Sequence, residues 1–187
     1  NMRDLRIDID VIGMIDISVE EIVARLMRVR RYAAEVGLEI AGFWSRAVEN
    51  LNEPTLVEHV AFCGAVRGNS MCVSPSGKIY GCGYSTTQLG EIGAFETFTQ
   101  PDSRYRRFVR DHQTGAMEMC RGCMIEGACG GGCNITQEFA RVTQSAKIDR
   151  MCDFYRKMTV ELLLEQLQDW PAAGIREATP NSLESSP

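Results

Sequence analysis

Eight cysteines are the residues of this sequence that are best suited to chemistry. Three lie early in the chain, with eight and nine residues between them; the other five follow as C-x2-C-x5-C-x3-C and, after a gap, one more. Their positions are Cys63, Cys72, Cys82, Cys120, Cys123, Cys129, Cys133 and Cys152. Because four thiolates ligate one [4Fe–4S] cluster, eight cysteines suffice for two such clusters.

Glycines surround the later cysteines. Gly122 lies inside the C-x2-C step, and Gly130, Gly131 and Gly132 fill the C-x3-C step. Without side chains, these positions let the backbone pass close to inorganic sulfide, and their amide N–H groups can donate to cluster sulfur. The composition of this loop therefore favours an iron–sulfur site.

Structural zinc is the main alternative, because four cysteines make a good tetrahedral zinc site. Zinc sites usually pair two short C-x2–4-C steps, and only Cys120/Cys123 and Cys129/Cys133 have such spacing here. Disulfides are a further alternative. No signal peptide is visible, however, so the thiols are expected to be reduced in a cytoplasmic protein. We therefore predict iron–sulfur binding.

The complete cysteine pattern resembles that of SPASM domains, the C-terminal auxiliary-cluster domains of radical SAM enzymes. The resemblance covers residues 60–170 and includes Gly77 and all seven cysteines of the family pattern. It implies two auxiliary [4Fe–4S] clusters. The implied ligands are Cys63, Cys82 and Cys133 for cluster I, and Cys120, Cys123, Cys129 and Cys152 for cluster II.

Cys72 lies outside the seven-cysteine pattern. Residues 71–74 and 78–82 flank a proline-first turn and are predicted to form a β-hairpin. In a hairpin with a three-residue loop, Cys72 pairs with Tyr80 and lies diagonal to Cys82 on the same face, within ~7–8 Å. We predict that Cys72 is the fourth ligand of cluster I. A buried structural cysteine and an open iron that binds substrate are the alternatives.

The residues before the cysteines read as a β-α-β unit. Residues 5–11 alternate between apolar and charged, which predicts a strand. Ser18 and Glu21 form a capping box for a helix that Gly37 ends, and residues 38–43 form a second strand. The apolar residues of the helix are Ile22, Leu26, Val29 and Ala33. Such a unit implies a parallel strand pair and normally belongs to a larger barrel or sheet.

Two further helices are predicted, over residues 95–111 and 153–170, the second with Phe154, Met158 and Leu162 on one face.

The predicted fold class is α+β. Residues 1–59 are expected to be the terminal elements of a truncated radical SAM β/α barrel. Residues 60–171 are expected to form the SPASM domain, with its hairpin, glycine-rich cluster loops and helices. Residues 172–187 are small, polar and proline-bearing, and are expected to be flexible.

Charge and hydropathy exclude several classes of partner. The formal net charge of −5 argues against a nucleic-acid partner. No apolar run approaches the ~20 residues needed to span a bilayer, so no membrane partner is expected. No catalytic residue is predicted, because the two histidines, His59 and His112, are more typical of surface or packing positions.

The sequence contains no C-x3-C-x2-C loop, which in radical SAM enzymes holds the cluster that binds S-adenosylmethionine. The chain alone is therefore not expected to cleave S-adenosylmethionine, and is expected to be either a fragment of a longer enzyme or a stand-alone module. The resemblance implies a parent enzyme that modifies a ribosomal peptide or protein and exchanges electrons with a ferredoxin or flavodoxin. S-adenosylmethionine and a third [4Fe–4S] cluster would belong to that longer enzyme. The alternatives are a stand-alone iron–sulfur electron carrier and a zinc-stabilised peptide-binding module.

Overall fold

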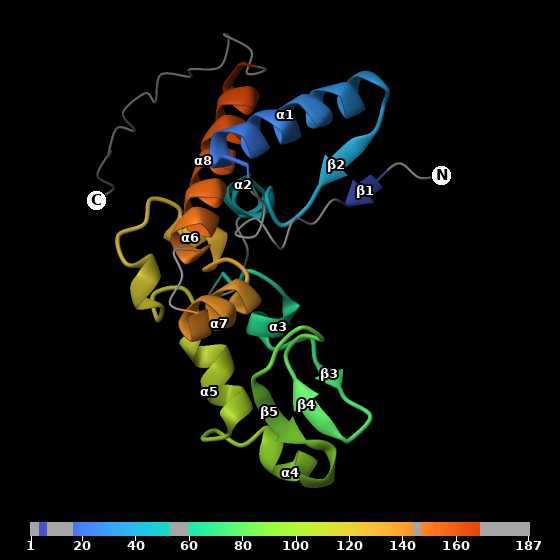
Figure 1. Cartoon of the computed structure of the whole chain (residues 1–187), viewed down its shortest axis with the longest axis vertical. Coiled ribbons are helices and arrows are strands. Elements are labelled where there is room, and N and C mark those ends of the chain that lie inside the picture. Colours follow the sequence, from blue (N-terminus) through green and yellow to red (C-terminus); the bar gives the residue numbers. More distant parts are fainter. Residues whose placement is uncertain (1–3, 7–16, 53–59, 144–146, 169–187) are drawn as a thin grey trace, which may run out of the picture.

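The computed structural model describes residues 4–6, 17–52, 60–143 and 147–168. Helices and two small sheets make up the chain, consistent with the predicted α+β class. The elements are β1 (Asp4–Arg6), α1 (Val19–Glu35), β2 (Glu39–Ala41), α2 (Arg46–Asn52), α3 (Gly64–Arg67), β3 (Cys72–Val73), β4 (Lys78–Tyr80), β5 (Gln88–Glu91), η2 (Ile92–Ala94), α4 (Phe95–Phe98), α5 (Arg104–Asp111), η3 (Glu118–Cys120), α6 (Glu126–Cys129), α7 (Asn134–Thr143) and α8 (Lys147–Gln168), where η marks a 3-10 helix. In Figure 1, α1 and the β1–β2 pair lie with α8 at one end, and β3, β4, β5 and α4 lie at the other.

The β-α-β unit is present in the described residues. Strands β1 and β2 are parallel, with Leu5 opposite Ile40, and α1 connects them. The part of the predicted first strand beyond Arg6 lies outside the described residues. Helix α1 begins as predicted, because the N–H of Glu21 donates to Ser18 Oγ at 3.1 Å. The Glu21 carboxylate itself pairs with Arg25, one turn further along.

Gly37 ends α1, as predicted. It has a left-handed backbone with φ of 75°, which glycine adopts at little cost. The N–H of Leu38 donates to Ala33 O at 2.8 Å, and that of Gly37 donates to Ala34 O at 3.1 Å. This pair of bonds is a Schellman motif, which satisfies carbonyls at the end of the helix.

The predicted apolar face of α1 is wrong at one position, Val29, which is 44% exposed. Ile22 and Leu26 are buried as predicted. Compared with the predicted face, the buried face of α1 is rotated about the helix axis towards Val23 and Met27. Val29 therefore lies beyond the edge of the buried face. The reason is that α8 covers α1 along this rotated face, which the period of the sequence alone does not locate.

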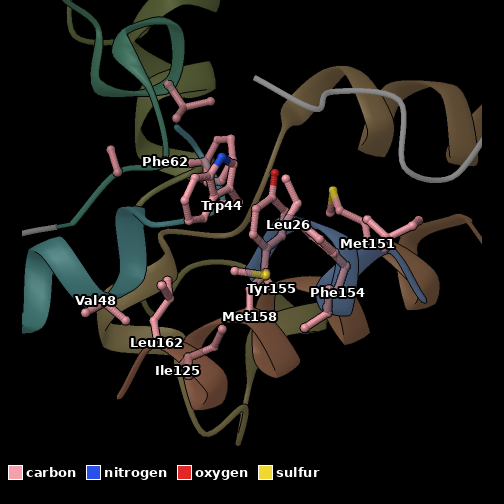
Figure 2. Close-up of a cluster of buried hydrophobic side chains, with 14 of the residues drawn as sticks. Leu26, Trp44, Val48, Phe62, Ile125, Met151, Phe154, Tyr155, Met158 and Leu162 are labelled. Carbon is pink, nitrogen blue, oxygen red and sulfur yellow. The ribbon is translucent and has the colours of Figure 1, made fainter. Parts of the chain in front are cut away.

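Helix α8 supplies the centre of the core. Phe154 and Met158 are completely buried and Leu162 nearly so, as the helical spacing predicts (Figure 2). The helix begins at Lys147, earlier than the predicted Asp153, because the buried side chain of Met151 extends its apolar face by one turn. Within the described parts of the chain, no helix combines the length and apolar character needed to cross a lipid bilayer.

Aromatic side chains join the N-terminal region to α8. Phe43 stacks on Phe62 with ring centroids 5.0 Å apart, and Phe62 meets Tyr155 of α8 edge-on at 5.2 Å. Trp44 is buried beside them in the same cluster (Figure 2). The predicted domain boundary near residue 59 lies in a stretch outside the described residues, but the segments on either side of it share this core.

The predicted hairpin is confirmed in its register. Strands β3 and β4 are antiparallel, Cys72 lies opposite Tyr80, and the N–H of Ser74 donates to Lys78 O at 2.9 Å. Strand β5 was not predicted; it pairs with β4 and makes a three-stranded sheet in the order β3-β4-β5.

The single helix predicted over residues 95–111 is wrong. The structure has two helices there, α4 and α5, separated at Pro101, which disfavours helical geometry in the residue before it. Ser103 then caps α5, since the N–H of Arg106 donates to its Oγ at 3.1 Å. The separation lets Phe98 stack on Tyr105, with ring centroids 4.3 Å apart.

Candidate metal centre

Four of the eight cysteines line one pocket between η3, α6 and α8. Cys120 ends η3, Cys123 follows in a turn, Cys129 ends α6, and Cys152 lies on α8. The glycine-rich loop after α6 completes the wall. These are the four cysteines that the family resemblance assigns to cluster II.

A tight turn places Cys120 and Cys123 on the same side of the pocket. The N–H of Cys123 donates to Cys120 O at 2.9 Å, and that of Glu126 donates to Cys123 O at 3.1 Å. Helix α6 then begins, and its position is fixed from the N-terminal region by Asn50, whose side-chain amide donates to Ala128 O at 2.8 Å. The C-x2-C spacing thus brings two thiols of one short segment to one wall.

Three consecutive left-handed glycines, Gly130, Gly131 and Gly132, wrap the loop around Cys129. Their φ values are 71°, 91° and 74°, a run that residues with side chains do not sustain. A Cβ on Gly130 would lie 2.5 Å from the backbone nitrogen of Phe62, so space as well as backbone geometry demands glycine. This conformation turns the N–H groups of Gly131 and Gly132 towards the Cys129 sulfur, to which both donate.

Burial dominates the electrostatics of these thiols. It raises the pKa of Cys129 to about 12, against the opposing effect of the two glycine N–H groups. Burial also raises the pKa of Cys120 to about 11, with smaller contributions from Cys152, Glu126 and Cys123. The thiols of Cys120 and Cys129 therefore favour the neutral form unless a cation replaces their protons.

Arg156 is the basic side chain beside this pocket. Burial raises the pKa of Cys152, and the Arg156 guanidinium opposes that rise. A positive charge at this position also stabilises a negatively charged group held by the four sulfurs.

The residues that line the pocket supply donor types that an iron–sulfur cluster uses. Four thiols line it, and two backbone N–H groups donate to one of their sulfurs, as in sites that tune cluster potential. Among the described residues, no group of three or more His, Cys, Asp or Glu side chains is close enough to bind a single metal ion.

The other four cysteines lie around the hairpin and the start of α7. Cys63 directly precedes α3, Cys72 lies on β3, Cys82 follows β4, and Cys133 directly precedes α7. All four are half-buried. Their grouping around one cluster stays a prediction.

Short contacts nevertheless connect the segments that carry these four cysteines. The N–H of Ser70 donates to Gly64 O at 3.2 Å, which closes the loop from Cys63 to Cys72. A Cβ on Gly83 would lie 3.8 Å from Cys72 Sγ, so the Cys72 thiol lies beside the residue that follows Cys82.

Glu138 connects the last two of these segments, and sequence reasoning missed it. Its carboxylate accepts hydrogen bonds from Ser85 Oγ at 2.7 Å and from the Thr86 N–H at 3.0 Å. It also accepts from Asn134 Nδ2 at 3.3 Å. Ser85 lies three residues after Cys82, and Asn134 directly follows Cys133. The sequence offered one signal for Glu138, its position one helical turn after Asn134. That signal could not be used, because α7 itself was not predicted.

Gln137 is a second supporting residue that the sequence did not reveal. Its side chain is 2% exposed, and its Nε2 donates to Gly131 O at 2.9 Å. This bond holds the glycine loop from α7. By contrast, His112 packs as predicted, with Nδ1 hydrogen-bonded to Phe108 O at 2.7 Å, and His59 lies outside the described residues.

Comparison with known proteins gives one distant relationship. No protein-family model matches the sequence. The chain is 20% identical over 157 residues to the radical SAM cyclopropyl synthase TigE of Paramaledivibacter caminithermalis. The alignment covers 81% of this chain and 31% of that enzyme, so the chain spans about a third of the length of the curated relative it matches. This sequence is therefore distantly similar to part of a radical SAM enzyme.

Proposed function

We propose that this chain is an auxiliary-cluster domain of a radical SAM enzyme that modifies a ribosomal peptide or protein. The observation that carries the proposal is the pocket lined by four cysteines and by Gly131 and Gly132 of the left-handed glycine run. The distant similarity to a radical SAM cyclopropyl synthase supports the same family.

The four-cysteine pocket would hold cluster II through Cys120, Cys123, Cys129 and Cys152. The hairpin region would hold cluster I through Cys63, Cys72, Cys82 and Cys133. The confirmed pairing of Cys72 with Tyr80 supports Cys72 as the fourth ligand, because it keeps the geometry on which that prediction rests. An open iron in cluster I remains the alternative.

Bound clusters would supply one-electron transfer, which suits the completion of a radical reaction on a peptide side chain. The chain's own residues would set the conditions for that transfer. The N–H groups of Gly131 and Gly132 donate to a ligand sulfur, and Arg156 places a positive charge beside the pocket. Both effects favour the more negative, reduced state of a cluster.

S-adenosylmethionine chemistry would come from the remainder of a longer enzyme. A ferredoxin or flavodoxin would be the outer electron partner. The name of the relative makes formation of a carbon ring one candidate reaction, beside thioether formation, other carbon–carbon crosslinks and formylglycine formation.

Anaerobic reconstitution with iron and sulfide tests the proposal. We expect a brown protein with about eight iron atoms and eight sulfides per chain, because each [4Fe–4S] cluster holds four of each. A colourless protein that instead retains zinc would support the zinc-stabilised peptide-binding module.

Two cysteine variants assign the ligands. Cys129→Ser is expected to remove cluster II and about half of the iron, and Cys72→Ala is expected to reduce or destabilise cluster I. An unchanged iron and sulfide content in Cys72→Ala would favour the open-iron alternative.

A further inference from the structure

We propose that the polar pocket between β5, α5 and α7 binds the carboxylate groups of an acidic peptide segment. The pocket has a volume of about 540 Å³, which lies within the range of small-molecule binding sites. It is distinct from the four-cysteine pocket, with which it shares no lining residue. Neither the predicted ligands nor the comparisons assign a role to it.

Three arginines give the pocket its positive charge. Arg104 and Arg107 extend from α5, and Arg141 extends from α7. All three side chains are exposed, and none has an ion-pair partner among the described residues. Because a guanidinium can bind a carboxylate through two parallel hydrogen bonds, three unpaired guanidiniums around one pocket are well suited to carboxylates.

The two acidic residues of the pocket, Asp111 and Glu138, offset part of this charge, so that three arginines and two carboxylates leave a net charge of +1. The Glu138 carboxylate is already occupied by the donors of Ser85, Thr86 and Asn134. Asp111 lines the pocket, and its carboxylate lies 3.9 Å from Nε of Arg110, a residue that does not line it. The three arginines therefore outnumber the two carboxylates, and the donors that already bind Glu138 leave that carboxylate less available to pair with an arginine.

The base of the pocket is polar and held in place. His112, Asn134 and Gln137 line it and are all buried. Gln137 is anchored to Gly131 O, and His112 to Phe108 O. Because these two buried side chains are fixed by their own hydrogen bonds, this part of the lining does not need to be ordered when a ligand binds.

The pocket adjoins the segments predicted to hold cluster I. Asn134 directly follows Cys133, and Phe108 packs against Gly81, where a Cβ would lie 3.3 Å from Phe108 Cε1. Gly81 directly precedes Cys82. A peptide anchored here would therefore lie beside cluster I; identifying the ligand as a peptide rests on the proposed function.

Fluorescence anisotropy of the full reconstituted chain tests the pocket. The probe is a fluorescein-labelled Gly-Glu repeat hexapeptide with an amidated C-terminus, and the matched control peptide is the Gly-Gln repeat. We expect the Glu peptide to bind at least about tenfold more tightly, a difference of ~1.4 kcal/mol. A Gly-Gln peptide with a free C-terminus distinguishes binding of a terminal carboxylate from binding of side-chain carboxylates. If it binds as tightly as the Glu peptide, the pocket is assigned to a C-terminal carboxylate.

Matched arginine variants locate the binding. Arg107→Gln and Arg141→Gln are each expected to weaken binding of the Glu peptide about five- to tenfold, and added salt should weaken it further. Arg106→Gln is the control, because Arg106 is exposed on the same helix and does not line the pocket. Equal affinity for the Glu and Gln peptides, or equal weakening by Arg106→Gln and Arg107→Gln, would overturn the proposal.

Iron and sulfide are counted on the same samples. A chain that holds its iron but does not distinguish the peptides disproves the carboxylate pocket alone. A chain that binds the Glu peptide through Arg107 but holds no iron disproves the cluster function and leaves the pocket standing.

Discussion

Glu138 accepts a hydrogen bond from Ser85 Oγ at 2.7 Å, across 53 residues of sequence. The bond joins the segment that follows Cys82 to the helix that follows Cys133. Because these two cysteines are predicted to ligate one cluster from distant parts of the chain, we propose that Glu138 is a positioning residue for cluster I.

Replacing Glu138 should therefore affect one cluster selectively. Glu138→Ala is expected to lower the iron content from about eight towards about four atoms per chain, because only cluster I depends on this contact. Metal analysis and the visible absorbance of the reconstituted protein measure the change. Glu96→Gln, at an exposed position on α4, is the control and should retain all of its iron. A Glu138→Ala protein with full iron content would show that the cysteines are held without this contact.

The glycine loop should tolerate no side chain at Gly131. Gly131→Ala forces alanine into a left-handed conformation with φ of 91° and places its Cβ against Met117, which is buried. We expect a loss of about 1–3 kcal/mol in the free energy of unfolding, together with loss of cluster II. Gly127→Ala is the matched control, because no atom lies within 4 Å of its Cβ and its φ is not left-handed. Urea unfolding and iron content measure both effects, and equal behaviour of the two variants would contradict the prediction.

The cluster-free protein should lose stability at alkaline pH. Burial raises the pKa of Cys129 from 9.0 to about 12 and that of Cys120 from 9.0 to about 11. The folded state therefore holds these protons more tightly than the unfolded chain, so this contribution to stability is present below pH 9 and is lost as pH rises from 9 to about 12. Anaerobic urea unfolding at pH 8 and pH 10.5 measures the loss.

Cys129→Ala provides the control for that measurement. It removes the thiol with the largest rise in pKa and leaves the lysines and tyrosines, which also titrate at high pH, unchanged. We expect a smaller difference between pH 8 and pH 10.5 in this variant than in the original chain. An identical difference would show that the alkaline loss comes from other groups.

The core around α8 should be the most sensitive to truncation. Phe154 is completely buried and lies edge-on to Tyr155, with ring centroids 5.3 Å apart. Phe154→Ala is expected to cost about 3–5 kcal/mol in the free energy of unfolding, because the surrounding side chains relax only partly into the space. Leu167→Ala, at a position 65% exposed on the same helix, should change it by less than about 0.5 kcal/mol. Denaturant midpoints of the two variants make the comparison.

Local features of the fold could be predicted because neighbouring residues determine them. Ser18 caps α1, Gly37 ends it, and the proline-first turn sets the pairing of Cys72 with Tyr80. Each depends on hydrogen bonds or backbone geometry within a few residues. The interruption at Pro101 was equally local and was missed because the apolar spacing across it was read as one helix.

The sequence by itself determined which residues could be ligands, since the number and spacing of the cysteines and the glycine run are properties of the chain. Only the tertiary structure decided what surrounds them. It buried Val23 of α1 instead of Val29, and it brought Glu138 to Ser85 and Gln137 to the glycine loop. It also placed Arg107 and Arg141 around one pocket. These contacts join segments far apart in sequence, and their partners depend on how the helices pack, which no local pattern specifies.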